Sequence, residues 1–333
     1  MRTANTWLIS AIIAGCGGLH SVVPPENTSQ VKLTKWTQVK KLPAVDYYGI
    51  SGVSGEATST APAAATIYVV GAGGTMLQGD GKNFTVLPNV TSADLHAVYV
   101  SSNKLVYAAG ANGTIVVYDG IAWQTQASGT TAQLEGIWGD QNEAFAVGAN
   151  GTALHYDGKL WSVVVTATPD SLYAVTRVGN ETIAVGSLGS IARWNGTQFD
   201  RTPIGGGFSK TLAGITASAA GTFVSGIDGA LFHYQDGNFT SIDGLPSVFA
   251  RSAAGPGNGD LFVVGWEGLI ARQRDGAFVV YPPLVGSTTP AAWLASVWCR
   301  DPTHVWIVGA SGTLLSGPPP NDPSPGSSAG SGR

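Results

Sequence analysis

The sequence predicts an all-β fold, a seven-bladed β-propeller made of four-stranded blades. Three observations support this prediction: a repeated turn motif, its regular period, and the short apolar strands that flank it. Seven times an apolar segment runs into a Gly-x-x-Gly turn and then into a second apolar segment. The turns begin at Gly71, Gly110, Gly148, Gly186, Gly226, Gly265 and Gly309. A period of about 40 residues with several strands per period is typical of a β-propeller.

One complete period spans residues 95–126 and predicts four short strands. The first three cover residues 95–100, 105–109 and 114–118, and the fourth starts near Trp123. The second and third strands are apolar on both faces, as expected of a sheet packed between two neighbours. We therefore expect each blade to bury both of its faces.

Two further columns recur in the period. An Asp-Gly or Asn-Gly pair joins the third and fourth strands at residues 119, 157, 195, 236 and 275. Such pairs supply the positive φ of a tight hairpin turn. A small residue recurs in the first strand at Gly136, Ala174 and Gly214. If this strand is innermost, the small side chains allow the strands to crowd around the axis.

The two ends of the repeat region predict how the ring closes. The last period supplies strands at 294–299, 305–308 and 313–316 and then stops. Residues 35–39 resemble the missing fourth strand, and residues 48–52 resemble the first strand of the first blade. Pairing of the N-terminal strand with the C-terminal blade would remove two open sheet edges.

The N-terminus carries a targeting signal. Arg2 precedes an apolar run over residues 7–13 that is too short to span a bilayer. The run ends in Ile13-Ala14-Gly15-Cys16, which resembles a bacterial lipobox. That resemblance implies a signal peptide over residues 1–15 and a Cys16 acylated with palmitate-type chains, which together form a stable anchor. The alternative is an ordinary secretory signal.

The regions that flank the repeats predict a tether over residues 16–30 and a disordered Pro/Gly/Ser tail over 317–333. The β-propeller occupies residues 31–316. Gly17, rather than Asp, follows the lipidated cysteine, which indicates the outer membrane of a bacterial cell envelope, on either its periplasmic or its surface face. With Cys16 acylated, only Cys299 remains, so we expect no intramolecular disulfide.

Charge and motifs exclude several classes of function. Charged residues make up 11% of the chain and the net charge is −4, which argues against nucleic-acid binding. No His/Cys/Asp cluster has metal-ligand spacing, and the Gly-x-x-Gly turns lack the lysine and helix of a phosphate loop. We therefore expect no metal and no cofactor. A pair of carboxylates placed together by the fold would leave a glycosidase possible.

The repeat resembles a known superfamily. Its elements are Leu-x-Gly-Ile-Trp at 134–138, Ala-Val-Gly-x-x-Gly-Thr at 146–152 and Tyr-Asp-Gly-x-x-Trp at 156–161. These resemble the neuraminidase-type (Asp-box) repeats, and within them the propellers of the photosystem II assembly-factor type and of many bacterial lipoproteins. The full Asp-box is shortened here to Asp-Gly, without its leading Ser, and the Arg-Ile-Pro motif of sialidases is missing. The resemblance implies the propeller fold over residues 31–316 and little about activity.

Two groups of residues are candidates for binding. Four consecutive blades carry a basic residue at one position of the third strand: His155, Arg193, His233 and Arg272. They could form a basic arc that binds an anion or an acidic partner, or they could be solvated strand ends that deter edge pairing.

The second group lies in the turns and loops on the opposite face. Blade 6 has Trp266-Glu267 in its turn, blade 5 has Asp228, and the preceding loop carries Phe208 and Lys210. An aromatic side chain beside an acid can stack on a sugar ring or anchor a protein. Alternatively, Trp266 packs into a neighbouring loop.

These observations predict a lipid-anchored, extracytoplasmic propeller that acts as a binding or assembly scaffold for an envelope protein or complex. We expect a monomeric propeller that binds a partner rather than transforming a substrate. Two alternatives remain open: a surface glycan-binding module and a glycan-active hydrolase or lyase.

Overall fold

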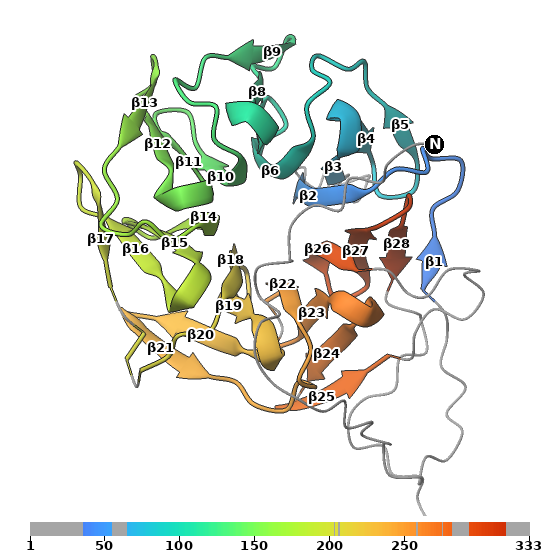
Figure 1. The fold of residues 1–333 in the computed structure, drawn as a ribbon. Coiled ribbons are helices and arrows are strands. Elements are labelled where there is room, and N and C mark those ends of the chain that lie inside the picture. Colours follow the sequence, from blue (N-terminus) through green and yellow to red (C-terminus); the bar gives the residue numbers. More distant parts are fainter. Residues whose placement is uncertain are drawn as a thin grey trace, which may run out of the picture. The chain divides into compact units, whose positions relative to one another are not determined.

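Seven four-stranded antiparallel sheets stand as blades around one axis (Figure 1), which confirms the predicted fold. The computed structural model describes residues 36–54, 65–202, 204–205, 207–257, 259–274, 276–281 and 293–317, all within one unit, Leu33–Arg333. The expected signal peptide and tether lie outside the described residues, as does the expected tail beyond Gly317.

Each of the first six blades is continuous in sequence. Blade 1 contains β2 (Tyr47–Ser54), β3 (Ala65–Gly71), β4 (Met76–Gly79) and β5 (Phe84–Val86); blade 2 contains β6 (Leu95–Ser102), β7 (Leu105–Gly110), β8 (Ile115–Tyr118) and β9 (Trp123–Gln126). Blade 3 contains β10 (Leu134–Gly139), β11 (Ala144–Gly148), β12 (Ala153–Tyr156) and β13 (Trp161–Val164); blade 4 contains β14 (Leu172–Val178), β15 (Glu181–Gly186), β16 (Ile191–Trp194) and β17 (Phe199–Arg201). Blade 5 contains β18 (Leu212–Ser218), β19 (Gly221–Gly226), β20 (Leu231–Gln235) and β21 (Asn238–Ser241); blade 6 contains β22 (Ala250–Ala254), β23 (Leu261–Gly265), β24 (Ile270–Arg274) and β25 (Ala277–Val280).

Blade 7 combines the two ends of the repeat region. It contains β26 (Leu294–Asp301), β27 (His304–Gly309) and β28 (Leu314–Gly317), with β1 (Thr37–Gln38) as its outer strand. Thr37 pairs with Ser316 and Gln38 with Leu315. The Trp36 side chain packs edge-on against Phe262 and Tyr281 of the blade 6 region. The predicted closure of the ring by the N-terminal strand is therefore confirmed.

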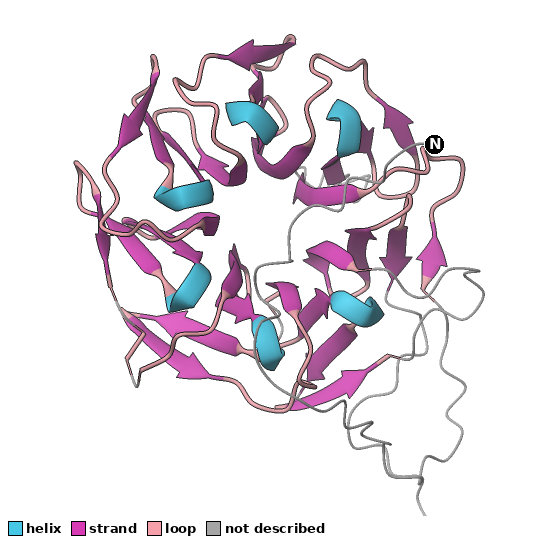
Figure 2. Ribbon diagram, viewed as in Figure 1, coloured by secondary structure: helices cyan, strands magenta, loops and turns pink. Residues whose placement is uncertain are grey.

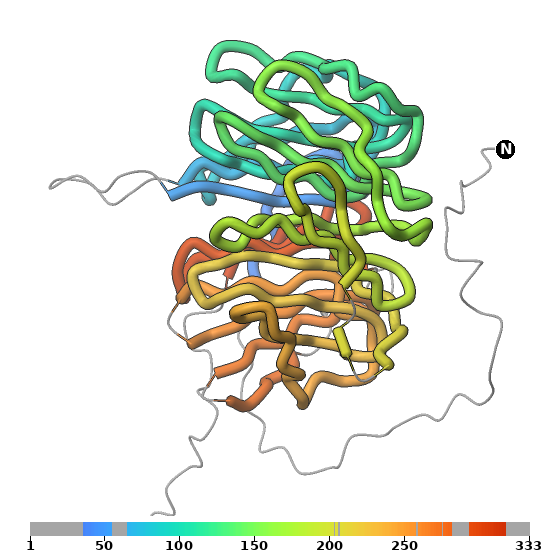
Figure 3. Tube along the Cα trace, turned by 90° about the vertical axis from the view of Figure 1, so that its left-hand side faces the viewer, coloured from blue at the N-terminus to red at the C-terminus, as the bar shows by residue number. Residues whose placement is uncertain are grey.

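The strands of each blade follow one another from the axis outward, so the first strand lines the centre and the fourth forms the rim (Figure 1). Viewed from the side, the ring is a disc whose thickness is set by the length of its strands (Figure 3). The second and third strands are each covered on both faces, as their sequences predict. One core cluster, for example, joins Ala109 and Ile115 of blade 2 to Leu134, Ala146 and Leu154 of blade 3.

The small residues of the first strands allow the inner strands to approach one another. A Cβ added to Gly136 in β10 would lie 2.8 Å from the Cα of Ala174 in β14, and one added to Gly214 would lie 2.7 Å from the carbonyl oxygen of Arg251. Both distances are too short for a side chain. The small-residue column is therefore explained by contact between neighbouring blades near the axis.

The two glycines of the repeated turn have different roles. Gly148, the first glycine of blade 3, has an extended backbone with φ −169°, but an added Cβ would lie only 2.0 Å from the carbonyl oxygen of Gln133. Gly151, the second glycine, has φ +67°, and a Cβ added to it would lie 2.1 Å from the carbonyl oxygen of Thr168. The first position requires glycine because a neighbouring carbonyl oxygen leaves no room for a side chain. The second position requires glycine for the same reason and because its backbone is left-handed.

Candidate binding surface

One side of the ring carries all the repeated turns. The turns between second and third strands form short 3₁₀ segments at η1 (Ala72–Gly74), η2 (Ala111–Gly113), η3 (Ala149–Gly151), η4 (Ser187–Gly189), η5 (Ile227–Gly229) and η6 (Trp266–Gly268) (Figure 2). In an antiparallel blade, the loops that lead from one blade to the next emerge on that same side. We call this side, with its turns and inter-blade loops, the turn face. The hairpins between third and fourth strands lie on the opposite side.

A β-bulge near the start of each first strand leaves one residue without a partner in the second strand. The ladder shifts register between Leu134 and Gly136 in blade 3, so Glu135 between them has no partner in β11. The same shift occurs in all seven blades. The unpaired positions are Tyr48, His96, Glu135, Tyr173, Ala213, Arg251 and Ala295. We call these seven residues the bulge ring.

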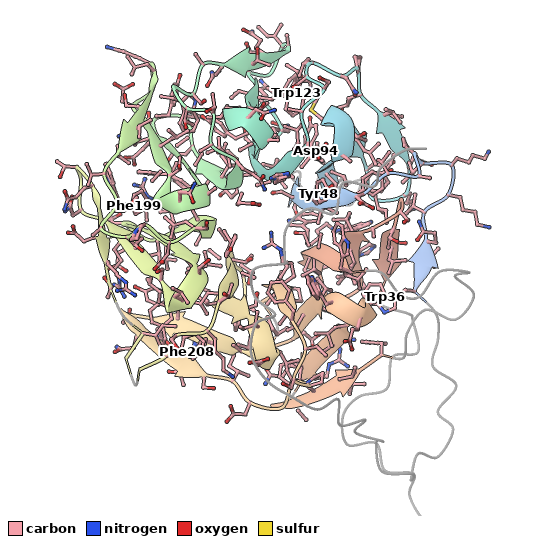
Figure 4. The ribbon with its side chains drawn as sticks, in the orientation of Figure 1. Trp36, Tyr48, Asp94, Trp123, Phe199 and Phe208 are labelled. Atoms are coloured by element: carbon pink, nitrogen blue, oxygen red, sulfur yellow. The ribbon has the colours of Figure 1, made fainter. Side chains whose placement is uncertain are left out.

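The bulge ring surrounds the mouth of the central channel on the turn face. The channel has a volume of about 360 Å³ and is lined by the first strands of the blades, including six of the seven bulge-ring residues, all except Ala213. Tyr48 lies at the inner end of blade 1, next to Asp94 of the following loop (Figure 4). The mouth therefore brings together polar and aromatic side chains from blades that are far apart in sequence.

One half of the mouth is tightly connected. The Tyr48 ring stacks on Trp293 with centroids 5.6 Å apart and meets His96 edge-on at 5.4 Å. Burial raises the pKa of Tyr48 to about 12, with smaller contributions from the carboxylates of Asp94 and Asp46. Its hydroxyl therefore remains protonated across the physiological range.

Glu135, the acidic residue of the bulge ring in blade 3, is held by neighbouring side chains. The Oε1 atom of Glu135 accepts a hydrogen bond of 2.6 Å from Nε2 of Gln133, and its Oε2 lies 3.5 Å from Nδ1 of His96. The same His96 nitrogen lies 3.1 Å from the carbonyl oxygen of Leu134. Both oxygens of the Glu135 carboxylate thus already have partners.

The other half of the mouth holds a cation. Nη1 of Arg251 donates to the carbonyl oxygen of Ala213 at 2.5 Å. Burial lowers the pKa of the Arg251 guanidinium, and the nearby Glu135 and Tyr173 oppose that change. The Tyr173 hydroxyl accepts a hydrogen bond of 2.9 Å from Oγ of Ser187. Arg251 and Tyr173 therefore present polar hydrogens to the channel.

The predicted Trp266 and Glu267 lie on the turn face in blade 6. Trp266 is 38% exposed, and its ring meets Phe249 of the preceding loop edge-on at 5.3 Å. It packs on a neighbouring loop and still presents part of its ring to solvent, so both predicted roles fit its position. Glu267, at the centre of η6, has φ +56°, a conformation that a glutamate adopts at a cost.

The predicted residues of blade 5 are divided between surface and core. Nζ of Lys210 lies 3.1 Å from Oδ2 of Asp228, and both side chains are about half exposed. Phe208 instead packs edge-on against Phe232 at 5.1 Å and belongs to the core between blades 4 and 5. Lys210 and Asp228 thus form a surface ion pair, while Phe208 holds the loop in place.

The four basic residues occupy equivalent positions in β12, β16, β20 and β24, as predicted, but three of them face acids. Nε2 of His155 lies 2.9 Å from Glu143, and Nη1 of Arg193 lies 3.2 Å from Glu181. Arg272 is buried, with Nη2 2.6 Å from Asp260. In each pair the acid precedes the base by 12 residues. These pairs join the second and third strands of each blade and largely neutralise the expected positive charge.

His233 differs from the other three. Gly221 stands where the other blades have their acid, and the His233 ring packs at 5.4 Å from Phe223. The signal for this pattern was present in the sequence as an acid 12 residues before each base. The pairing is found only when the basic residues of the third strand are compared with the residues at the start of the second strand.

The two cysteines also occupy different places. Cys16 lies outside the described residues. Cys299 lines the lower channel, and its Sγ contacts the carbonyl oxygen of Ala254 at 3.5 Å. Burial raises the pKa of this thiol far above its usual range. Cys299 thus behaves as the buried small side chain that its apolar surroundings predict, because a thiolate is disfavoured there.

Comparison with known proteins supports the fold. No protein-family model and no curated protein matches this sequence. A structure of YCF48 bound to D1 peptide aligns with a TM-score of 0.65 at 16% identity, over 85% of this chain and 94% of that chain. YCF48 from Cyanidioschyzon merolae gives 0.64 at 16% identity over 85% and 98%, and the WD40 β-propeller domain of Doa1 gives 0.63 at 17% over 83% and 93%.

Two further observations concern the described residues alone. Within them, no helix is long and apolar enough to cross a membrane. Across the same part of the chain, no three His, Cys, Asp or Glu side chains are grouped so that they could hold a metal ion.

Proposed function

We propose that this chain is a binding scaffold that captures a protein partner of the cell envelope on its turn face and is tethered there by lipid at Cys16. The observation that carries the proposal is the Trp266-Glu267 turn. It presents a large aromatic side chain and a carboxylate at a position where blades 2 and 3 have Ala111-Asn112 and Ala149-Asn150.

The backbone at this turn supports a binding role. The central residue of every such turn has a left-handed backbone, which Gly and Asn adopt readily and Glu does not. Keeping Glu267 there sacrifices some stability at an exposed site. Residues that cost stability and contact solvent are frequently retained for binding.

Two further points fit a protein partner. Aromatic side chains that are partly buried and partly exposed are common anchors of protein interfaces. One similar propeller, YCF48, has been solved with a bound D1 peptide, so a propeller of this architecture can hold a peptide segment. For the cellular location, the support is the lipobox-like run that ends at Cys16.

The test is in-cell crosslinking and recovery of the full chain, with mass spectrometry of the captured proteins. Trp266→Ala should reduce recovery of the dominant partner by about tenfold, the effect of losing a central aromatic anchor. Its melting temperature should stay close to that of the unaltered chain, because the lost contacts are partly exposed. Cys16→Ser should move the protein from the membrane fraction to the soluble fraction.

The matched control is Ile121→Ala. Ile121 is 89% exposed in a hairpin on the side opposite the turn face, so its removal should leave recovery unchanged. Equal recovery with both variants would contradict the role of Trp266. If no specific protein is recovered but a glycan array binds the chain through Trp266, the glycan-binding alternative is favoured, because an aromatic ring beside a carboxylate also suits a sugar.

A further inference from the structure

We propose that the mouth of the central channel is a carboxylate-binding site in which the Arg251 guanidinium and the Tyr173 hydroxyl hold the ligand. The inference goes beyond the proposed function, since it concerns the bulge ring at the axis and does not depend on Trp266. The ligand group is either a free small carboxylic acid or a carboxylate that a partner protein inserts into the channel.

Arg251 has donors that the protein does not use. A guanidinium carries five N–H groups, and the hydrogen bond to the carbonyl oxygen of Ala213 uses one of them. Among the described residues, no carboxylate oxygen lies within 4.0 Å of its nitrogens. Arg251 lines the channel, and none of its other nitrogens is among the fully buried, unpartnered polar atoms, so these N–H groups are accessible there.

The two ring positions beside Arg251 leave room for a ligand. Ala213, the ring residue before it, is buried and does not line the channel, and Ala295, the ring residue after it, lines the channel with a side chain that ends at Cβ. The other ring positions in the described blades carry larger side chains. The cation therefore faces an open part of a channel of about 360 Å³, which accepts a small group and excludes a folded domain.

Tyr173 supplies a second donor. Its oxygen accepts the hydrogen bond from Ser187, which leaves the phenolic proton free for a ligand. Arg251 and Tyr173 occupy equivalent bulge positions in blades 6 and 4, and both line the channel. A fork of guanidinium N–H groups with one hydroxyl matches the two oxygens of a carboxylate.

Glu135 determines the charge that the site accepts. Gln133 and His96 already hold both of its oxygens, so it does not neutralise Arg251 by direct contact. Its negative charge nevertheless lies close enough to act on Arg251. A dianion such as phosphate would be repelled more strongly than a monoanion, and this favours a single carboxylate.

The test uses the full chain in detergent with butyrate as the probe, followed by calorimetry and by NMR of arginine Nε–H groups. One saturable site should appear, and one arginine signal should shift and vanish from the spectrum in Arg251→Met. That variant should weaken butyrate binding by at least about tenfold, the effect of losing a charge-assisted pair. Tyr173→Phe, which keeps the ring, should weaken it by roughly threefold to tenfold.

Four comparisons make the result decisive. Butyramide, which is neutral, and methylphosphonate, measured at a pH above its second pKa where it is a dianion, should bind more weakly than butyrate. The control Arg201→Met removes an exposed arginine from the outer strand of blade 4 and should leave binding unchanged. A peptide with a free C-terminal carboxylate that competes with butyrate, where its amide does not, would identify a partner protein as the source of the group; failure to compete would identify a free acid.

Butyrate that fails to bind, or that binds Arg251→Met or butyramide equally well, would overturn the proposal. Tighter binding of methylphosphonate would also overturn it. If Arg251→Met does not fold, Tyr173→Phe and the comparison of butyrate with butyramide decide the question, because neither requires that variant.

Discussion

At the scale of the residue, the same backbone position is used in two ways around the ring. The centre of the turn is occupied at little cost by Gly73, Asn112 and Asn150, and at higher cost by Leu188 and Glu267, all with φ between 53° and 63°. A left-handed backbone disfavours side chains that cannot hydrogen-bond locally. Blades 2 and 3 therefore favour stability at this position, and blade 6 places a carboxylate there at a cost.

Glu267→Asn should stabilise the protein by about 0.5 kcal/mol, because Asn adopts the left-handed conformation more readily than Glu. Thermal unfolding should show a melting temperature raised by roughly 1–2 °C. The reverse exchange, Asn150→Glu in blade 3, should lower it by a similar amount. A melting temperature that falls for Glu267→Asn would mean that the Glu267 carboxylate stabilises the fold.

At the level of single residues, the sequence predicts the hairpin turns and misses the side chains at the bulges. Asp119-Gly120 predicts its turn correctly, since Asp119 accepts from two backbone N–H groups and Gly120 has φ +92°. Glu135 and Arg251 escape prediction because they occupy bulges. A bulge places two consecutive residues of one strand opposite a single residue of its partner strand. Strict alternation of side chains along a strand does not predict this arrangement. Comparing the residue before each small residue of the first strand would have revealed the bulge ring.

At the scale of the element, each blade is held to its own inter-blade loop by the first glycine of its turn. Gly148 lies so close to the carbonyl of Gln133 that no side chain fits. Beside it, the backbone N–H of Ala149 donates to that same carbonyl at 2.9 Å. The Gly-x-x-Gly period was therefore predictable because every blade must make this same contact.

Gly148→Ala should destabilise the protein by about 2–3 kcal/mol, since the new methyl group must displace backbone rather than a flexible side chain. Equilibrium unfolding in urea should show a lower midpoint with an unchanged slope. Gly129→Ala, in a loop where no atom lies within 4 Å of the added Cβ, tests conformational strain without a clash. Because Gly148 is extended and carries no such strain, an unchanged midpoint in Gly148→Ala would show that crowding at this position is unimportant.

At the scale of the whole molecule, the ring depends on a two-residue strand and one tryptophan. β1 contributes two paired residues to blade 7, and Val39 adds a backbone hydrogen bond of 2.8 Å to Leu314. Trp36 is 7% exposed and joins the core cluster between blades 6 and 7. Packing of this single side chain therefore supplies much of the closure.

Trp36→Ala should destabilise the fold by about 3 kcal/mol through loss of a buried aromatic side chain. Hydrogen exchange should then accelerate in β28, which loses protection when β1 detaches. Trp123→Ala is the matched control, because Trp123 begins the outer strand of blade 2 and leaves the closure intact. Unchanged exchange in β28 would show that backbone pairing alone closes the ring.

Acid should destabilise the whole ring through its turn aspartates. Hydrogen bonds from the backbone N–H groups of Ala122 and Ile121 lower the pKa of Asp119, and those of Leu160 and Lys159 do the same for Asp157. A pKa that is lower in the folded than in the unfolded chain adds stability above the unfolded value, about 3.9, and this stability is lost as the pH falls below it. Melting temperatures should be nearly constant from about pH 7 to 5 and decrease below about pH 4.

The chain provides its own control for this pH dependence. Asn195 occupies the same turn position in blade 4, and its Oδ1 accepts hydrogen bonds from the N–H groups of Thr197 and Gln198 at 2.9 and 3.0 Å. Asp119→Asn with Asp157→Asn should therefore keep the turns and reduce the acid sensitivity. An unchanged pH profile would assign the effect to other carboxylates.

The pairing of β1 with β28 also sets an order of events during synthesis. Thr37 and Ser316 are separated by 279 residues, so at 5–20 residues per second the ribosome makes the second strand roughly 15–55 s after the first. Throughout that interval the residues of β1 have no strand to pair with. The positive charges of Lys40 and Lys41 directly after it oppose aggregation of that segment until the last blade emerges and completes the ring.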